Sequence, residues 1–213
     1  MKVVEKEFYE NDTDFVAKEL IGKKLTRILE YENITYKLGG IIVETEAYGH
    51  DDDSASHAYI GISNRNKIMF EKTGCAYIYL IYGKHYCFNV TARNEKKKAG
   101  AVLIRALYPE KGIDIMSKLR NTTELENLTS GPSKLSQALC INKDINGMDL
   151  TQNNTIWIEY GIKPDAIGCT SRIGISRAKE VPWRFVMLDK NQQNYLLNPY
   201  VSKRKDIIKI IED

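Results

Sequence analysis

Two glutamates and a tyrosine alternate in the stretch Val43–Tyr48, which begins as a buried strand would. Because successive side chains of a strand point to opposite faces, Glu44, Glu46 and Tyr48 should share one face. Carboxylates that replace apolar residues in this way are typical of a catalytic site, and also of an edge strand with a solvated face. Glu46 is the best candidate for a general acid or base, because it follows the apolar run and precedes an aromatic residue.

The spacing of Glu44 and Glu46 leaves a second chemistry open. In a regular strand their Cα atoms lie roughly 6.5 Å apart, close to the carboxyl separation of an inverting sugar hydrolase. A carbohydrate hydrolase that uses both acids is therefore one alternative. The other interpretation, which we favour, makes Glu44 a surface acid held in a salt bridge.

A polar loop follows Tyr48 and ends in His57. This histidine could act as a base, a metal ligand or a hydrogen-bonding group. The only other histidines are His50 and His85, and the three lack the spacing of metal ligands. We therefore predict a polar contact for His57 and no metal site. The acidic run 51–53 is expected to be a solvated loop.

A β-hairpin is predicted at residues 76–90, because aromatic and branched residues flank a glycine turn at Gly83. Tyr82 stands directly before this turn. A hairpin tip cannot bury a large ring in its own sheet, so this ring should project outward. A projecting aromatic side chain is suited to insertion between nucleic-acid bases or stacking on one.

Three further segments of the sequence carry polar residues that their predicted strand or helix does not by itself require. Arg105 lies inside the apolar run 102–107, and since an unpaired buried charge is costly, it must be paired or functional. Asn89 is a weaker example inside another strand. Ser133 and Lys134 open a predicted helix that could hold an anion, although an ordinary helix cap explains them equally well.

The length of 213 residues suits one large domain or two small ones, and the lack of a clear linker favours a single domain over residues 1–213. The chain is 43% hydrophobic and carries a net charge of +3, which is too weak to identify a nucleic-acid partner. Its four scattered cysteines indicate reduced thiols in a cytoplasmic protein, and no apolar run has the length of a membrane helix. Strands and helices mix without regular βαβ alternation, which favours an α+β fold with a largely antiparallel sheet.

The apolar patterns and turn residues predict the individual elements. Helices are expected after the caps at 11–13, over 110–119 and over 135–141. Strands are expected over 25–31, 34–36, the central stretch that follows Gly39 and Gly40, both arms of the hairpin, 100–107, 155–159, 172–175 and 183–188.

Several stretches together resemble the alkyladenine DNA glycosylase family, the mammalian-type 3-methyladenine DNA glycosylases. They occur in family order from about Val43 to Val186, and they read VETEAY, ASHA, SNRNKIMF, YIYLIYGKHYCFNV, GAVLIRALYP, SGPSKL, RIGIS and PWRF. The resemblance implies one α+β domain with a curved antiparallel sheet, flanking helices and a protruding hairpin. It also implies that the chain excises alkylated or deaminated purines of the 3-methyladenine, 7-methylguanine and hypoxanthine class from double-stranded DNA.

Carried over position by position, the resemblance implies roles for the residues around the central strand. Glu46 matches the general base that activates water. Arg105 and the main chain at Val102 match groups that help to hold this water. Tyr82 matches the residue at the hairpin tip that fills the gap left in the duplex.

The resemblance also implies a pocket for the flipped base and contacts to the DNA backbone. Tyr48, His57 and Tyr79 match residues that stack on the base and hydrogen-bond to it, and Asn89 matches a residue that screens purines. The expected backbone contacts are Arg65, Asn66, Ser133 and Lys134. Two stretches depart from the family pattern: Ser63–Asn64, and the long basic connection 93–98.

A cationic base leaves easily, so one carboxylate that activates water suffices, and no metal or nucleotide cofactor is expected. The nucleophile is then water and the enzyme a monofunctional monomer that works on cytoplasmic or nucleoid DNA. A neutral base must gain a proton, and His57 is one candidate donor. A non-catalytic nucleic-acid-binding module remains the alternative.

Overall fold

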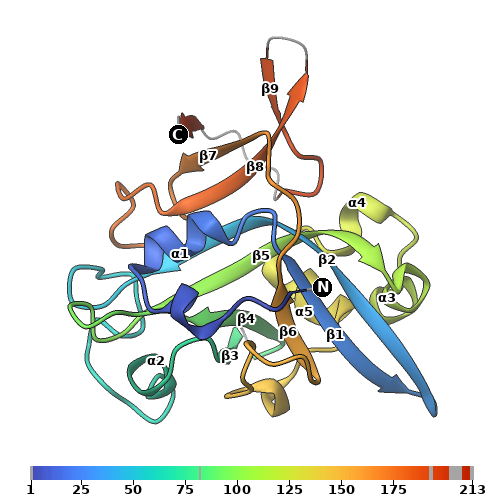
Figure 1. Ribbon diagram of the computed structural model, residues 1–213, viewed down its shortest axis with the longest axis horizontal. Helices are drawn as coiled ribbons and strands as arrows, with labels where there is room; N and C mark the ends of the chain where they lie inside the picture. Colours follow the sequence, from blue (N-terminus) through green and yellow to red (C-terminus); the bar gives the residue numbers. More distant parts are fainter. Residues whose placement is uncertain (1, 82, 192–193, 202–207, 212–213) are drawn as a thin grey trace.

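One open antiparallel sheet organises the computed structural model, which describes residues 2–81, 83–191, 194–201 and 208–211 (Figure 1). The strands run in the order β10-β7-β8-β2-β5-β4-β3 across the sheet, β1 pairs with β2 and β6, and β9 pairs with β8. The predicted single α+β domain with an antiparallel sheet is confirmed. The bounds of the strands are β1 Lys24–Tyr31, β2 Ile34–Tyr48, β3 Ala76–Ile81, β4 His85–Thr91, β5 Ala101–Lys111, β6 Ile156–Glu159, β7 Ala166–Thr170, β8 Arg184–Asn191, β9 Asn194–Leu197 and β10 Lys209–Ile211.

Short helices cover the sheet, and α1 lies across β2 and β5 (Figure 1). The Thr45 hydroxyl donates a hydrogen bond of 2.7 Å to the carbonyl of Ala17 in α1. Thr45 therefore faces α1, and its neighbours Glu44 and Glu46 face the other side of the sheet. The bounds of the helices are η1 Lys6–Tyr9, α1 Thr13–Glu19, α2 Ile68–Glu71, α3 Ile113–Arg120, α4 Leu125–Leu128, α5 Pro132–Ala138 and η2 Lys143–Ile145.

Strand β2 is longer than the sequence pattern indicated. The predicted strand at 34–36 and the central strand are one continuous strand, and the two glycines that looked like a break lie inside it. A Cβ at Gly39 would lie 2.4 Å from the carbonyl oxygen of Leu25, and one at Gly40 would lie 2.0 Å from that of Tyr108. The pairing with β5 shifts register between these glycines. They therefore mark a bulge where neighbouring backbones approach closely.

The other predicted elements have mixed outcomes. The hairpin is confirmed as β3 and β4, and Gly83 has the positive φ of 67° that its turn requires. The helix predicted over 110–119 begins only at Ile113, because β5 continues to Lys111. The strand predicted over 172–175 is wrong: this segment is irregular, and β7 ends just before it.

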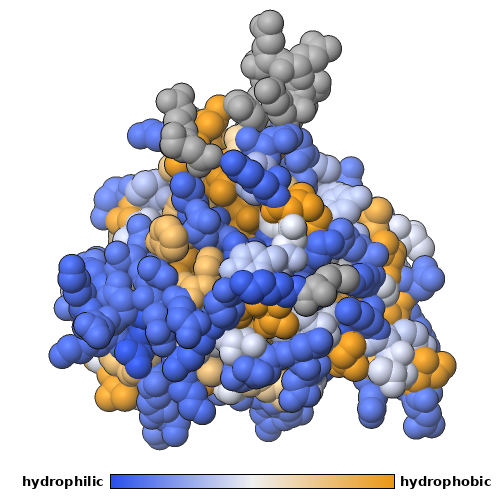
Figure 2. Space-filling view, viewed as in Figure 1, coloured by the Kyte–Doolittle hydropathy of each residue, from blue (hydrophilic) through white to orange (hydrophobic). Residues whose placement is uncertain are grey.

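The surface is mainly polar, and no helix in the described ranges is long and apolar enough to cross a membrane. On the face shown in Figure 2, hydrophilic residues surround small apolar patches. The main core contains buried side chains of α1, β2 and β5, among them Val16, Ile42, Ile104 and Leu107. This core holds the central strands, on which the site is built, in a fixed position.

Candidate active site

Arg105 is a bulged residue of β5 that points at both glutamates of β2. Glu44 pairs with Ala106 and Thr45 pairs with Ile104, so Arg105 is the extra residue between two pairs. Its Nε lies 2.9 Å from Oε1 of Glu44, and its Nη1 lies 3.0 Å from Oε2 of Glu46. A β-bulge redirects a side chain in this way, and here it directs one guanidinium at two acids.

The carboxylate of Glu46 is fully buried and is held by three donors. Oε2 accepts from Arg105 and, at 2.8 Å, from the hydroxyl of Tyr48, while Oε1 accepts from the main-chain nitrogen of Ile173 at 2.6 Å. Burial, and then the charge of Glu46, raises the pKa of Tyr48 well above its ordinary value. Tyr48 is therefore a neutral phenol that donates to Glu46, and the donors on both oxygens fix the plane of the carboxylate.

Glu44 belongs to a buried chain of alternating charges. Its Oε1 accepts from Arg105 and, at 2.6 Å, from Nε of Arg184 in β8. Burial alone would lower the pKa of Arg105, but Glu46 and Glu44 together raise it, so the guanidinium stays charged. The predicted salt bridge of Glu44 is confirmed, but its surface location is wrong, because the residue has no exposed area. An acid held between two arginines is poorly suited to the paired catalysis of a sugar hydrolase.

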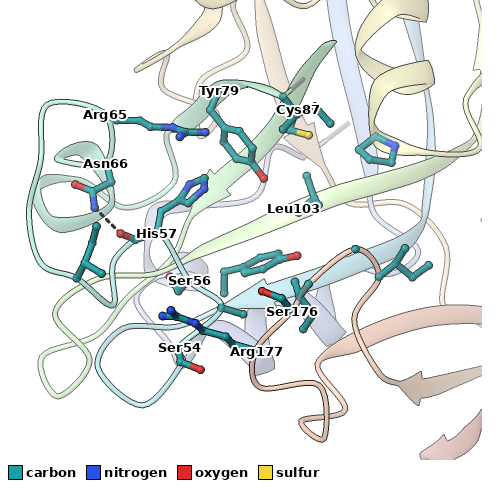
Figure 3. Close-up of a pocket in the computed structure, with 18 of the residues that line it drawn as sticks. Ser54, Ser56, His57, Arg65, Asn66, Tyr79, Cys87, Leu103, Ser176 and Arg177 are labelled. Carbon is teal, nitrogen blue, oxygen red and sulfur yellow. Dashed lines mark hydrogen bonds between the residues drawn. The ribbon is translucent and has the colours of Figure 1, made fainter. Parts of the chain in front are cut away.

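A cavity of about 700 Å³ opens beside this charge chain (Figure 3). Tyr48 reaches it from β2, Leu103 and Arg105 reach it from β5, and the guanidinium of Arg65 lies 5.1 Å from the ring centre of Tyr79. The cavity is lined by Tyr48, Ser54, Ala55, Ser56, His57, Ile60, Ser63, Arg65, Asn66, Tyr79, Ile81, Cys87, Leu103, Arg105, Pro132, Ile173, Gly174, Ile175, Ser176 and Arg177. Tyr48, His57 and Tyr79, which the sequence assigned to one pocket, thus share one cavity.

His57 is a neutral hydrogen-bonding residue of this cavity. Its Nδ1 lies 2.9 Å from the hydroxyl of Tyr77, and its ring meets that of Tyr79 edge to face at 4.7 Å. Burial, together with the positive charge of Arg65, lowers the pKa of His57 to about 4. The predicted polar contact is confirmed. The role of His57 as a proton donor to a neutral base is not supported, because its ring is unprotonated near neutral pH.

Asn89 lies deeper, at a second small cavity of about 30 Å³ that it shares with Tyr48, His57 and Tyr79. The side chain is 2% exposed, and its amide donates to the carbonyls of Tyr77 at 2.9 Å and Cys87 at 3.4 Å. Asn89 therefore lies behind the three residues predicted to hold the base.

The two loop residues expected to contact the DNA backbone differ in position. Arg65 is exposed at the cavity, where it is accessible to a phosphate. Asn66 is 1% exposed, and its amide donates to the carbonyls of His57 and Gly61, at 2.7 and 2.9 Å. The first of these bonds is drawn in Figure 3. We reassign Asn66 from DNA contact to holding the loop, because its polar atoms bind protein groups.

Four predicted residues remain: Ser133, Lys134, Val102 and Tyr82. Lys134 binds Asn127, and of the segment 132–134 only Pro132 lines the cavity, so Ser133 and Lys134 are not brought to it. Val102 is fully buried and pairs with Ala47 of β2 and Val90 of β4, and the main-chain group that binds Glu46 is the nitrogen of Ile173. Tyr82 lies outside the described residues.

Sequence reasoning missed an ion pair that joins two loops of the site. Arg172 binds both oxygens of Asp53, at 2.6 and 2.7 Å, and also the carbonyl of Ala47 at 2.8 Å. Its guanidinium lies 4.9 Å from the ring centre of Tyr48 and 5.4 Å from that of Trp183. The expected solvated loop is wrong for Asp53, which is 1% exposed. The only sequence feature that pointed to Arg172 was the stretch RIGIS, which contains Arg172 and Ile173.

The described part of the chain contains no group of three or more histidine, cysteine, aspartate or glutamate side chains placed to hold a metal ion. What the fold assembles is a fixed carboxylate, a permanent cation and a cavity with aromatic walls. This combination defines a class: a single-domain α+β enzyme with a buried carboxylate beside a cavity that aromatic residues line.

Comparison with known proteins gives the family. The sequence model of the methylpurine-DNA glycosylase family matches residues 7–191. A protein of Carboxydothermus hydrogenoformans, assigned as a 3-methyladenine DNA glycosylase, is 46% identical over 201 residues, which cover 93% of this chain and 98% of that one. A protein of Chlorobium phaeobacteroides with the same assignment is 41% identical, over 96% of this chain and 99% of that one. One of Clostridium botulinum is 44% identical, over 86% of this chain and 95% of that one.

The chain therefore belongs to the methylpurine-DNA glycosylase family. Membership in this family makes the protein a DNA glycosylase, a hydrolase of DNA repair.

Proposed function

We propose that this enzyme flips a damaged purine of double-stranded DNA into the cavity and hydrolyses its N-glycosidic bond with water activated by Glu46. The proposed substrates are 3-methyladenine, 7-methylguanine and hypoxanthine. The single observation that carries the proposal is the fixed carboxylate of Glu46 beside a cavity with aromatic walls. We further propose that the enzyme works as a monomer on cytoplasmic DNA.

The hydrogen bonds of Glu46 support its role as the base. A carboxylate has about four acceptor positions. Among the described residues, Arg105 and Tyr48 occupy two on Oε2, and Ile173 occupies one on Oε1. The remaining acceptor position on Oε1 suits a water molecule, which the carboxylate would deprotonate as it attacks C1′ of the sugar.

The aromatic walls favour a cationic, flat substrate. Purines methylated at N3 or N7 carry a positive charge, and Tyr48 and Tyr79 line the cavity with electron-rich rings that attract cations. His57 is neutral, so it can hydrogen-bond to a base edge without repelling this charge. A cationic base also departs easily, which is why one carboxylate suffices.

The test is release of free base from alkylated duplex DNA, followed by chromatography under single-turnover conditions. The proposal predicts release of methylated purines by the wild-type enzyme and loss of release in Glu46→Gln. Borohydride added during the reaction should trap no protein–DNA adduct, because water rather than an amine attacks the sugar.

A non-catalytic nucleic-acid-binding module is the alternative function. Such a module gains little from a buried carboxylate next to a polyanion, which argues for the enzyme. The same assay separates the two, because a binding module would retain alkylated DNA and release no base. An adduct trapped by borohydride would replace the water mechanism with an amine nucleophile.

A further inference from the structure

The loop tip 59–62, beside the cavity, exposes three large apolar side chains to solvent. Ile60 is 83% exposed, Ile62 is 64% exposed and Tyr59 is 44% exposed. Ile60 is the most exposed large hydrophobic side chain of the described residues. Scattered apolar residues on a surface need no explanation, but three within four positions, of which Ile60 lines the cavity, indicate a contact surface.

The tip is held in place by hydrogen bonds at both of its ends. The buried side chain of Asn66 donates to the carbonyls of His57 and Gly61 and accepts from the main-chain nitrogen of Ser63 at 2.6 Å. Gly61 also donates from its main chain to Ala58 at 3.0 Å. One buried asparagine thus connects the tip to the cavity histidine, and the apolar side chains are presented on a preorganised turn.

The position of the tip indicates what it contacts. Ile60 lines the same cavity as Arg65 and Arg177, which are both exposed. A nucleotide that enters the cavity carries its phosphates and neighbouring bases past these three side chains. The arginines suit a polyanion, while Ile60 suits the apolar face of a base or sugar.

We propose that the tip 59–62 is an apolar DNA contact, in which Ile60 packs against the nucleotide next to the flipped one. This inference rests on the proposed function, because it takes the cavity as the site of the flipped base. An apolar side chain placed against a partly unstacked step stabilises the distorted duplex. It therefore favours binding to lesion-containing DNA more than binding to an intact helix.

The test compares Ile60→Ala with Ile34→Ala, both made in the Glu46→Gln background so that the DNA stays intact. Ile34 is the matched control: it is 54% exposed, it begins β2 and it does not line the cavity. Dissociation constants are measured on a short duplex with one hypoxanthine, on the undamaged duplex and over a range of salt concentrations. Melting temperatures show that both variants fold.

We expect Ile60→Ala to bind the lesion duplex roughly tenfold more weakly, with a smaller change on undamaged DNA and no change for Ile34→Ala. The slope of log Kd against log salt should stay at its parental value in Ile60→Ala, because no phosphate contact is lost, and should decrease in Arg177→Ala. Ile60→Leu should retain most of the affinity.

Unchanged affinity of Ile60→Ala, or equal losses in Ile60→Ala and Ile34→Ala, would overturn the inference. Binding of the wild-type protein to lipid vesicles that Ile60→Ala abolishes, with DNA affinity intact, would assign the tip to a membrane and overturn it as well. The proposed function is tested separately by base release from the wild-type enzyme. A negative result for Ile60→Ala therefore does not affect the test of base release.

Discussion

Nη1 of Arg105 lies 3.0 Å from Oε2 of Glu46, and both residues are almost completely removed from solvent. The cation keeps the carboxylate in one orientation, so under the proposed mechanism the attacking water would approach Glu46 in a fixed geometry. Replacement of this base by an amide tests its role directly.

Glu46→Gln should keep its affinity for lesion DNA and lose base release by roughly 10²–10⁴-fold, because an amide cannot accept the proton of water. Glu44→Gln is the matched control on the same strand, and since Glu44 is held between Arg105 and Arg184 and is not the proposed base, its loss of excision rate should be far smaller. Single-turnover excision rates measure both variants. Equal losses would favour the sugar-hydrolase type of chemistry, in which both acids act, and a normal rate in Glu46→Gln would remove Glu46 from the mechanism.

Arg105→Lys tests whether one guanidinium must hold both acids. An ammonium group is a point donor on a different stem, so it cannot reproduce the two bonds from Nε and Nη1. We expect the excision rate to fall by roughly 10²-fold while a fluorescent base analogue still flips with normal amplitude. A rate close to that of wild type would show that charge alone suffices at this position.

Asp53→Asn should destabilise the protein by about 3–5 kcal/mol, because Arg172 would lose its buried counter-ion. Asp52→Asn is the control one residue earlier: Asp52 pairs with Lys97 at the surface, so its loss should cost less than about 1 kcal/mol. Urea unfolding measures both values. Similar small losses in the two variants would mean that the pair of Asp53 and Arg172 does not hold the loops together.

The sequence predicted the parts of the site that lie on regular strands. Glu46, Tyr48 and Arg105 follow from apolar runs interrupted by polar or aromatic residues, Tyr79 follows only from the family resemblance, and the structure brings the four to one place. The antiparallel sheet follows from the same patterns. These features depend on local periodicity, which a single sequence records directly.

Long-range contacts could not be predicted in this way. The bulge that directs Arg105 at both acids depends on the register between β2 and β5, and local alternation does not specify it. The pair of Asp53 and Arg172 joins residues far apart in the sequence, so Asp53 looked like part of a solvated acidic run. The main-chain donor of Ile173 could not be recognised from its residue type, because every residue except proline has this group.

Tyr82→Ala tests the hairpin tip, which the sequence places between the end of β3 and the start of β4. Loss of the ring should weaken stable flipping by about 1–3 kcal/mol, the value of a stacking contact, whereas Tyr82→Phe keeps the ring and should behave as wild type. Fluorescence of a lesion-base analogue reports the flipped fraction. If Tyr82→Ala flips the base as well as Tyr82→Phe does, another group fills the gap in the duplex.

His57 gives the protein a defined dependence on pH. Its pKa in the folded state is lowered to about 4, below the ordinary value of about 6.5 in the unfolded chain. As the pH falls through this window, the unfolded state takes up a proton that the folded state excludes, so stability present above about pH 6.5 is lost toward pH 4. His57→Asn cannot bind this proton and should lose about 1 kcal/mol less than wild type between about pH 7 and about pH 5, a value reduced for partial exposure. Urea unfolding at the two pH values measures the difference.

The rate of hypoxanthine excision, measured against pH, should decline at the same alkaline pH in His57→Asn as in wild type, because a neutral imidazole does not supply the proton to the base. A shift of that limb, or equal pH dependence of stability in the two proteins, would show that His57 is protonated in the folded enzyme.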